Sequence, residues 1–460
     1  MRCAGRRVGG VRGGLDLEGA FLRKVKARGN REMRKRGLKR ANTGSGKRVR
    51  WGPREVGRWI YLGLIVGLLT ILAVANFRLY TSVRLDGALA QLAFLERVLN
   101  EGAAERMQEW FPEGYVFTWA LYGLAAAQAA EALDADDPRR DPLFEQAWRA
   151  VDAVDSPKAR STFDPDLTPP YGAFYCGWSL YLRGVLLKAT GPDVWPAEIL
   201  ERLESDCRVF AEALRARGHP YLPSYEGQAW PADTVTGIAG LALRDRVLGS
   251  RFEGVIADWL EQVRAREDPD LGTLSHAADV RDGSPLLGTR GSSLALMSRL
   301  LVEVDPAYAR DQYERLRRYF VDYRWGLPGV REYPHGVRGR GDVDSGPLVL
   351  GYSGPAMVVG GAAARAHGDE ELAGVLLSMA EAAGFPVTLF GHKRYLGGLV
   401  PVGDAFFAWA HTTPVGPGVS APLEPLLPRL WRLGLHTLSL PFAALAFWRI
   451  RRLWRENLTG

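Results

Sequence analysis

A chain of 460 residues with 47% hydrophobic and 10% aromatic content can bury a large core, which excludes a protein that is disordered throughout. The net charge of +7 is not spread evenly, because residues 1–58 hold 19 of the 59 Lys and Arg residues but only four of the 52 acidic ones. The remaining 40 basic and 48 acidic residues make the rest of the chain acidic, so its composition does not indicate a nucleic-acid partner.

The N-terminal residues predict a tail followed by a membrane anchor. Residues 1–58 are rich in Gly, Lys and Arg and too poor in apolar residues to offset the entropy of ordering, so we expect a disordered basic tail. Residues 59–77 read WIYLGLIVGLLTILAVANF, without a formal charge, which predicts a transmembrane helix. A cleavable signal peptide is the alternative, but this apolar stretch is long and starts far from the N-terminus.

A second apolar segment lies near the C-terminus. Residues 433–448, LGLHTLSLPFAALAFW, are interrupted by His436 and Pro441, so they predict either a second transmembrane helix or a helix lying in the interface. The excess of positive charge places the tails at residues 1–58 and 449–460 in the cytoplasm. Residues 82–416 would then form an extracytoplasmic domain at the cell membrane, where Cys176 and Cys207 either pair or remain separate thiols.

The domain between the anchors has a helical period almost everywhere. Helices with a polar face are expected at about 85–110, 141–155, 196–217, 252–266, 306–324 and 369–384. More apolar helices, rich in small residues, are expected to start near Phe117, Phe174, Asp233, Gly291, Ser353 and Asp404. The second set recurs every fifty to sixty residues, which predicts an all-α fold, an (α/α)6 toroid of six helical hairpins with the apolar helices inside.

A long loop precedes each expected inner helix, and loops of this length in a compact domain usually carry function. The polar residues concentrated there include Glu113, Asp164, Tyr175, Tyr225, Glu226, Gln228, Asp233, His276, Asp279, Arg290, Glu332, Tyr333, His335, Asp342, Asp344, His392, Tyr395 and Asp404. Asp233 opens an apolar helix, so it is either an acid of the first helical turn or a group that faces a shared cavity. In GDVDSGP, Asp342 and Asp344 alternate, so one can face the cavity while the other holds the loop.

These residues predict an acid–base site. Two carboxylates in a partly desolvated cavity push each other's pKa apart, which leaves one as an acid and one as a base. We expect the catalytic group to comprise Asp233, Asp344, Tyr175, Glu226, His335 and Asp404. Substrate binding is expected from Trp119, Trp178, Trp230, Tyr225, Gln228, Tyr333, His276 and Arg290. His276, His335 and His392 lack a compact metal-ligand spacing, so neither a metal nor another cofactor is expected.

Extended stretches of the chain resemble a known family. They include YVFTWALYGLA, FYCGWSLYLRGVLLKATG, WPADTVTGIAGLALRDRVLG and VDSGPLVLGYSGPAMVVGGAAARAHGD, within the region from about Tyr115 to Gly384. These segments are similar to the linalool dehydratase/isomerase-like domain family, whose fold is an (α/α)6 barrel. The resemblance implies acid–base chemistry on a terpene alcohol by cysteines, a histidine, tyrosines and an aspartate. This chain has Ser224 and Asp233 where the resemblance would place the two cysteines, and Trp178 where it would place the histidine, while Tyr175 is kept.

Three functions of different class fit the sequence. The first is a membrane-anchored lyase or isomerase of the dehydratase type that acts on an isoprenoid or lipid-like alcohol. The second is an envelope glycoside hydrolase or polysaccharide lyase, which the paired carboxylates and the aromatic residues would also suit. The third is a non-catalytic envelope protein that binds a small molecule or glycan in its central cavity. The expected partners are the membrane and that ligand, with no nucleic acid.

Overall fold

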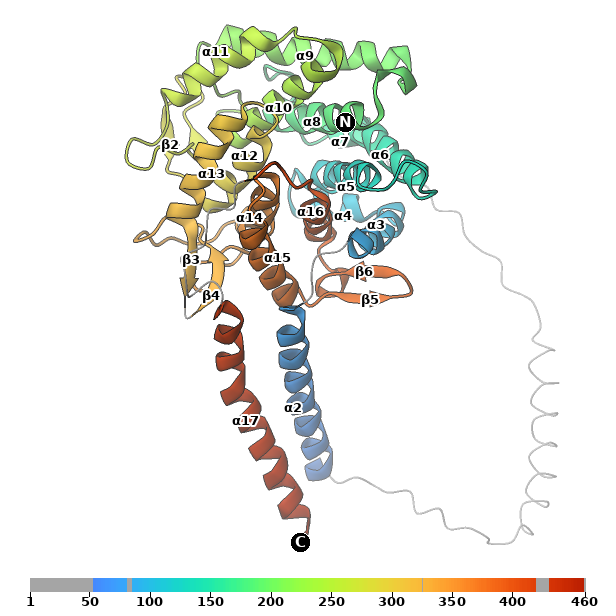
Figure 1. The fold of residues 1–460 in the computed structure, drawn as a ribbon, viewed down its shortest axis with the longest axis vertical. Coiled ribbons are helices and arrows are strands. Elements are labelled where there is room, and N and C mark those ends of the chain that lie inside the picture. The colour runs from blue at the N-terminus through green and yellow to red at the C-terminus, as the bar shows by residue number, and fades with distance from the viewer. Residues whose placement is uncertain (1–52, 81–84, 325, 419–429, 459–460) are drawn as a thin grey trace, which may run out of the picture. The chain divides into compact units, whose positions relative to one another are not determined.

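The computed structural model describes residues 53–80, 85–324, 326–418 and 430–458, and these residues are mostly helical (Figure 1). The chain divides into two compact units, Met1–Leu62 and Gly63–Gly460, and helix α2 (Pro53–Arg78) crosses from one to the other. Most of the predicted basic tail, with Cys3, lies outside the described residues. The helical domain expected at residues 82–416 falls within the second unit.

Six helices of the second unit make a closed cycle of contacts, which we call the six-helix ring. They are α5 (Gly114–Glu131), α8 (Gly172–Thr190), α10 (Pro231–Leu248), α12 (Gly291–Leu301), α14 (Gly354–Ala366) and α16 (Pro401–Thr412). Each packs against the next, and α16 packs against α5. All six lie where the apolar, small-residue helices were predicted, and most residues of α5, α8 and α10 are buried.

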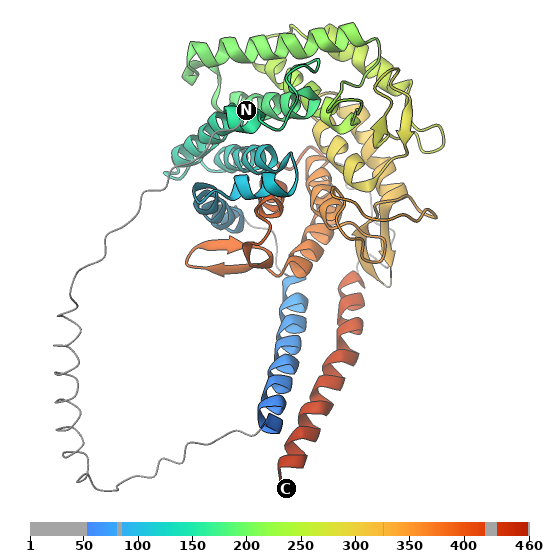
Figure 2. The same cartoon turned by 180° about the vertical axis from the view of Figure 1, so that it is seen from behind.

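A second set of helices covers this ring (Figures 1 and 2). It contains α3 (Leu85–Asn100), α4 (Ala103–Trp110), α6 (Arg140–Val154), α9 (Ala197–Arg217), α11 (Glu253–Arg264), α13 (Pro306–Phe320) and α15 (Glu370–Gly384). Short helical turns occur at α7 (Pro157–Arg160), η1 (Pro192–Val194) and η2 (Leu396–Gly398). These outer helices are amphipathic. In α9, for example, Leu203, Cys207, Phe210 and Leu214 recur at helical spacing on the buried face.

Three two-stranded antiparallel sheets interrupt the described helical chain. They pair β1 (Ala277–Ala278) with β2 (Pro285–Leu287), β3 (Val321–Arg324) with β4 (Leu327–Val330), and β5 (Val387–Leu389) with β6 (His392–Arg394). The helix predicted over 306–324 is therefore wrong at its end, because it stops at Phe320. Val321 and Tyr323 are residues that favour strands, and Gly326, at a φ of 76°, lies in the turn that leads into β4.

Glycine brings two ring helices into backbone contact. A Cβ atom added at Gly240 of α10 would lie 2.8 Å from the backbone carbonyl carbon of Leu180 in α8. One added at Gly177 of α8 would lie 2.7 Å from the backbone oxygen of Asp233. Helices α8 and α10 can pack this closely because neither glycine has a side chain to separate them.

Two further helices are long and apolar enough to cross a membrane. Candidate spans run over Glu55–Arg78 in α2 and Trp431–Arg455 in α17 (Trp431–Leu458), and they contain the segments 59–77 and 433–448 predicted from the sequence. A helix in the core of a soluble protein would bury its large apolar side chains. Here Leu64, Phe77, Phe442 and Phe447 are exposed.

Polar side chains connect the two apolar helices close to the domain. Asn76 Nδ2 donates to Ser439 Oγ at 2.9 Å, and Tyr80 Oη lies 2.6 Å from His436 Nε2. Elsewhere in the second unit, Cys176 and Cys207 are both free thiols, so the disulfide alternative does not hold in this structure.

Replacing Gly240 with alanine is expected to lower the free energy of unfolding by about 1–3 kcal/mol, because the added methyl group would meet the α8 backbone. Gly254 in α11 is a matched control, since nothing lies within 4 Å of an added Cβ there. Gly254→Ala is expected to be neutral or to stabilise the protein by up to about 1 kcal/mol. Urea unfolding of the full chain in detergent measures both values, and equal effects would contradict the close packing of α8 on α10.

Candidate functional site

Asp233 lies in the first turn of α10, beside the loop that enters the helix. Trp230 is the N-cap residue and makes no side-chain cap, and Asp233 is 9% exposed. Burial raises the pKa of Asp233 to about 8, although a hydrogen bond with the Ser224 side chain opposes this rise. The charges of Glu113 and Asp344 raise it further. An acid that served mainly to favour the helix dipole would have a lowered pKa, so Asp233 is instead a buried carboxyl group that stays protonated at neutral pH.

Glu113 and Tyr225 lie next to this carboxyl group. Glu113 immediately precedes α5, and the Tyr225 hydroxyl donates a hydrogen bond to its Oε1 atom. Burial raises the pKa of the Tyr225 hydroxyl far above its usual range, and the charge of Glu113 adds to the shift. Smaller contributions come from Asp233 and Asp344, so all four side chains lie within electrostatic reach of one another. We call Glu113, Tyr225, Asp233 and Asp344 the carboxylate cluster.

The loop segment that carries Tyr225 is a tight turn. Tyr225 and Gln228 are bridged through their backbones, and Gly227 adopts a φ of 70°, a left-handed conformation that favours glycine. Glu226 and Gln228 are exposed at this turn, whereas Tyr225 is half-buried. Of the predicted residues in this turn, only Tyr225 therefore joins the carboxylate cluster directly.

Asp344 provides the second predicted carboxylate. Its side chain is exposed to solvent, yet burial against surrounding protein raises its pKa to about 6. The charges of Asp342 and Glu113 raise this pKa as well, while Arg290 lowers it. Asp344 is therefore mostly ionised at pH 7, while Asp233 is mostly protonated.

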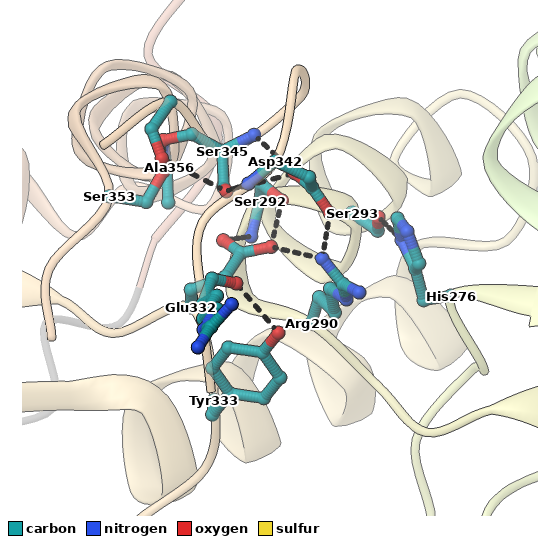
Figure 3. A network of polar contacts seen from close by, with 12 residues as sticks. His276, Arg290, Ser292, Ser293, Glu332, Tyr333, Asp342, Ser345, Ser353 and Ala356 are labelled. Carbon is teal, nitrogen blue, oxygen red and sulfur yellow. Dashed lines mark hydrogen bonds and ion pairs between the residues drawn. The ribbon is translucent and has the colours of Figure 1, made fainter. Parts of the chain in front are cut away.

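Asp342 and Arg290 hold the loop that presents Asp344 (Figure 3). Asp342 Oδ1 accepts hydrogen bonds from the backbone nitrogen of Ser345 at 3.0 Å and from its hydroxyl at 2.9 Å, and Arg290 binds the other carboxylate oxygen. Burial opposes ionisation of Asp342, but these hydrogen bonds outweigh it and lower its pKa. The Arg290 guanidinium also stacks over the Tyr333 ring at 5.3 Å.

Glu332 and His276 extend the same network (Figure 3). Glu332 is fully buried, accepts a hydrogen bond from Ser292 Oγ at 2.8 Å, and has a pKa raised by burial to about 7. His276 Nδ1 lies 2.6 Å from Ser293 Oγ, and its ring packs edge-on against Trp230 at 5.0 Å. Burial lowers the pKa of His276 to about 4, so the ring is neutral at pH 7. The network therefore connects the start of α12 with the start of α10.

Three residues predicted for the site lie in the helical core instead. The Tyr175 hydroxyl donates to the Val154 carbonyl of α6 at 3.1 Å, so it binds an outer helix. Trp178 has no exposed surface, and its ring is therefore closed to a ligand by packing against neighbouring aromatic side chains. Trp119 is 9% exposed and packs against Tyr122.

Two other predicted residues have partners outside the carboxylate cluster. His335 is exposed, and its Nε2 lies 3.1 Å from the Val321 carbonyl of β3. Asp404 is buried at the start of α16, where its Oδ1 accepts from the Tyr395 backbone nitrogen at 2.8 Å and lies 3.4 Å from Gln91 Nε2. Burial raises the pKa of Asp404 to about 7. Its hydrogen bonds are to Tyr395 and Gln91, not to residues of the carboxylate cluster.

The predicted catalytic group omitted Glu113 and Glu332. Glu113 directly precedes α5 in the same way that Asp233 opens α10, and this equivalence of position was the available signal. Glu332 was among the polar residues of the loop before α14, but it lies far from the start of that helix, so its position did not single it out. Within the residues that the structure describes, no group of three His, Cys, Asp or Glu side chains is placed to hold a metal ion.

Comparisons with known proteins do not assign this chain to a family. No protein-family model matches the sequence, and no curated protein matches it. The resemblance to the linalool dehydratase/isomerase-like family therefore stays a prediction. A GH76 alpha-mannanase of Bacteroides thetaiotaomicron is similar in structure at 8% identity and a TM-score of 0.42, covering 65% of this chain and 84% of its own.

Two other solved structures are similar over most of their length. A polysaccharide lyase covers 69% of this chain and 97% of its own, at 14% identity and a TM-score of 0.35. A glycosyl hydrolase of family 88 from Bacteroides vulgatus covers 69% and 99%, at 13% identity and a TM-score of 0.35. At these TM-scores the similarity supports no argument about fold or activity, so the functional argument depends on the site itself.

Replacing Asp233 with asparagine is expected to stabilise the protein above pH 5. The folded-state pKa of about 8 lies far above the ordinary value of 3.8, so folding loses stability as pH rises between these values, and asparagine removes that loss. The free energies of unfolding from urea titrations at pH 5 and pH 8.5 should differ more for the parent than for the variant, by at least about 1 kcal/mol. Asp270→Asn, at an exposed loop residue, is the control and should follow the parent. A variant that is less stable than the parent at pH 8.5 would contradict a buried, uncompensated carboxyl group.

Proposed function

We propose that the six-helix ring and its outer helices form an (α/α)6 toroid, and that this protein is a membrane-anchored glycoside hydrolase of the cell envelope. The observation that carries the proposal is the pair of carboxyl groups with separated pKa values, Asp233 near 8 and Asp344 near 6. Glycoside hydrolysis requires one carboxylic acid and one carboxylate at the same bond, and this pair supplies both at neutral pH.

The proposed mechanism assigns one step to each carboxyl group. Asp233 donates its proton to the glycosidic oxygen, which makes the leaving sugar neutral as the bond to the anomeric carbon breaks. Asp344, open to solvent, accepts a proton from the water that attacks that carbon. Glu113 is a positioning residue, because it binds the Tyr225 hydroxyl and its charge favours the protonated form of Asp233.

The surroundings of the pair favour a glycan over a terpenoid. Arg290 and Asp342 place charged groups within electrostatic reach of Asp344, and hydroxyl-rich sugars can hydrogen-bond to such groups. A terpene or other lipid-like alcohol would instead require a closed apolar pocket. The same acid and base could also dehydrate an alcohol or eliminate across a uronate, as the lyase alternatives would require. Product analysis distinguishes these reactions, since hydrolysis adds water while both lyase reactions leave a new double bond.

The acid–base assignment predicts a bell-shaped pH profile. Activity should rise as Asp344 ionises through about pH 6 and fall as Asp233 loses its proton above about pH 8. Asp233→Asn and Asp344→Asn should each lower kcat/KM by about 100-fold or more, the usual scale for a general acid or base. Release of reducing ends from envelope glycan fractions measures this activity.

Asp270→Asn is the control for this experiment and should retain the parent's activity. Turnover by Asp233→Asn that matches the parent's would contradict the assignment. Binding of a glycan without hydrolysis by the parent would instead support the non-catalytic alternative.

We further propose that α2 and α17 span the cell membrane and that the domain faces outward. The support is the length of the two helices, their exposed apolar side chains, and the basic residues that flank them at residues 1–58 and 449–460. The glycan would then be one that lies within reach of the membrane surface.

A reporter enzyme that is active only outside the cytoplasm, fused after residue 420, should be active. The positive charge at both ends of the chain retains those ends in the cytoplasm, so the fusion point lies on the other side. A reporter fused at residue 460 is the matched control and should be inactive. Activity only in the second fusion would reverse the orientation.

A further inference from the structure

The segment from residue 385 to 399 displays large apolar side chains to solvent. It contains the β5–β6 hairpin, and the exposed residues are Phe385, Val387, Leu389, Phe390, Leu396 and Leu399. Every residue of β5 is exposed, and Phe390 at the tip is 99% exposed. An apolar patch of this kind is a candidate surface for a membrane or another protein.

The backbone conformation at the hairpin tip disfavours a bulky residue such as Phe390. Leu389 pairs with His392, so Phe390 and Gly391 form a two-residue turn, and their φ values are 51° and 79°. A turn with two left-handed residues favours Asn-Gly or Asp-Gly, because a bulky side chain is strained at the first position. Phe390 makes no compensating packing contact, since its side chain is almost fully exposed. Neither the turn nor the core therefore explains an aromatic residue here.

Hydrogen bonds place this hairpin beside the end of an apolar helix. Arg78, the last residue of α2, donates from Nη2 to the Pro386 carbonyl at 3.2 Å, immediately before β5. On β6, Lys393 is fixed by Glu381, whose Oε1 lies 2.5 Å from its Nζ, and the strand packs against α3. The hairpin is thus attached at its base, and Figure 2 shows it running sideways from the end of the domain at which α2 joins it.

Basic side chains lie at the same end of the domain. Arg78 and Arg394 flank the hairpin, and Arg432 in the first turn of α17 donates to the Leu79 carbonyl at 3.0 Å. Arginine beside exposed aromatic and aliphatic side chains is the pattern of a segment that lies in a lipid interface, where anionic headgroups attract the basic groups.

We infer that the tip of the β5–β6 hairpin inserts into the membrane interface beside α2. Phe390 and Leu389 enter the boundary between headgroups and acyl chains, while the basic residues at the base contact the headgroups. Two spanning helices hold the domain at the membrane but leave its tilt free, and this third contact sets the tilt. The inference concerns membrane attachment and requires no enzymatic activity, so it can fail or hold independently of the proposed hydrolase.

Position-specific fluorescence in lipid nanodiscs tests this contact. The full chain carries Cys3→Ser and Cys176→Ser and retains the buried Cys207. In this background, Phe390→Cys is labelled with an environment-sensitive nitrobenzoxadiazole dye. The nanodiscs contain phosphatidylcholine and phosphatidylglycerol. Leu286→Cys in β2 is the matched control, because it is also an exposed apolar residue of a two-stranded hairpin.

Nitroxide groups in the upper acyl chains should quench the dye at residue 390 at least about twofold more than the dye at 286, and aqueous iodide should quench it less. Equal iodide quenching at both positions would overturn the inference. Protection from iodide without nitroxide quenching would also overturn it, because a protein surface, such as a second copy, would then cover the tip.

A second variant separates insertion from a role in folding. Phe390→Asn replaces the strained residue by one that the turn favours, so the melting temperature in detergent should stay the same or rise. A dye at Leu389→Cys should lose its nitroxide quenching in that variant but retain it with Phe390 present. A lower melting temperature with unchanged quenching would assign Phe390 to folding and contradict the inference.

Discussion

The close approach of α8 and α10 is the constraint on which the candidate site depends. Only glycine at residues 177 and 240 allows the two backbones to touch, and the contact at Gly177 is with the carbonyl oxygen of Asp233 itself. The packing that helps to close the six-helix ring therefore also fixes the first turn of α10. This packing places Asp233 at a buried position, and burial is the main cause of its raised pKa. Fold and electrostatics are coupled at this one residue.

Charge distribution around the carboxylates explains why Asp233 remains neutral. The cation of this network, Arg290, binds Asp342 and lies 3.9 Å from Glu332, so its charge is already neutralised there. Asp233 instead has a serine hydroxyl and two further carboxylates within electrostatic reach. A neighbouring arginine would have lowered its pKa and made it a conventional buried ion pair. Retaining a protonated acid in this place reduces stability at neutral pH, which is a pattern typical of functional sites.

Periodicity in the sequence was sufficient to locate the ring helices but not the direction of individual side chains. Small apolar residues at helical spacing predicted all six positions, because burial on every side leaves a strong signal. The same signal cannot distinguish a side chain that faces a cavity from one that faces another helix, so Tyr175 and Trp178 were assigned to the site although they pack in the core. The contact of Glu113 with Tyr225 joins residues 112 positions apart, and local patterns carry no information about such pairs.

The two apolar helices contain polar side chains that hydrogen-bond to one another. Asn76, His436 and Ser439 are polar groups within segments that are otherwise suited to lipid, where an unpaired polar group is costly. Here they bind one another, and Tyr80 adds a further hydrogen bond to His436. These bonds hold α2 beside α17 at the point where both join the domain. In the proposed membrane topology, the domain is attached through two adjacent helices rather than one flexible anchor, and the proposed hairpin contact would fix the tilt that these helices leave open.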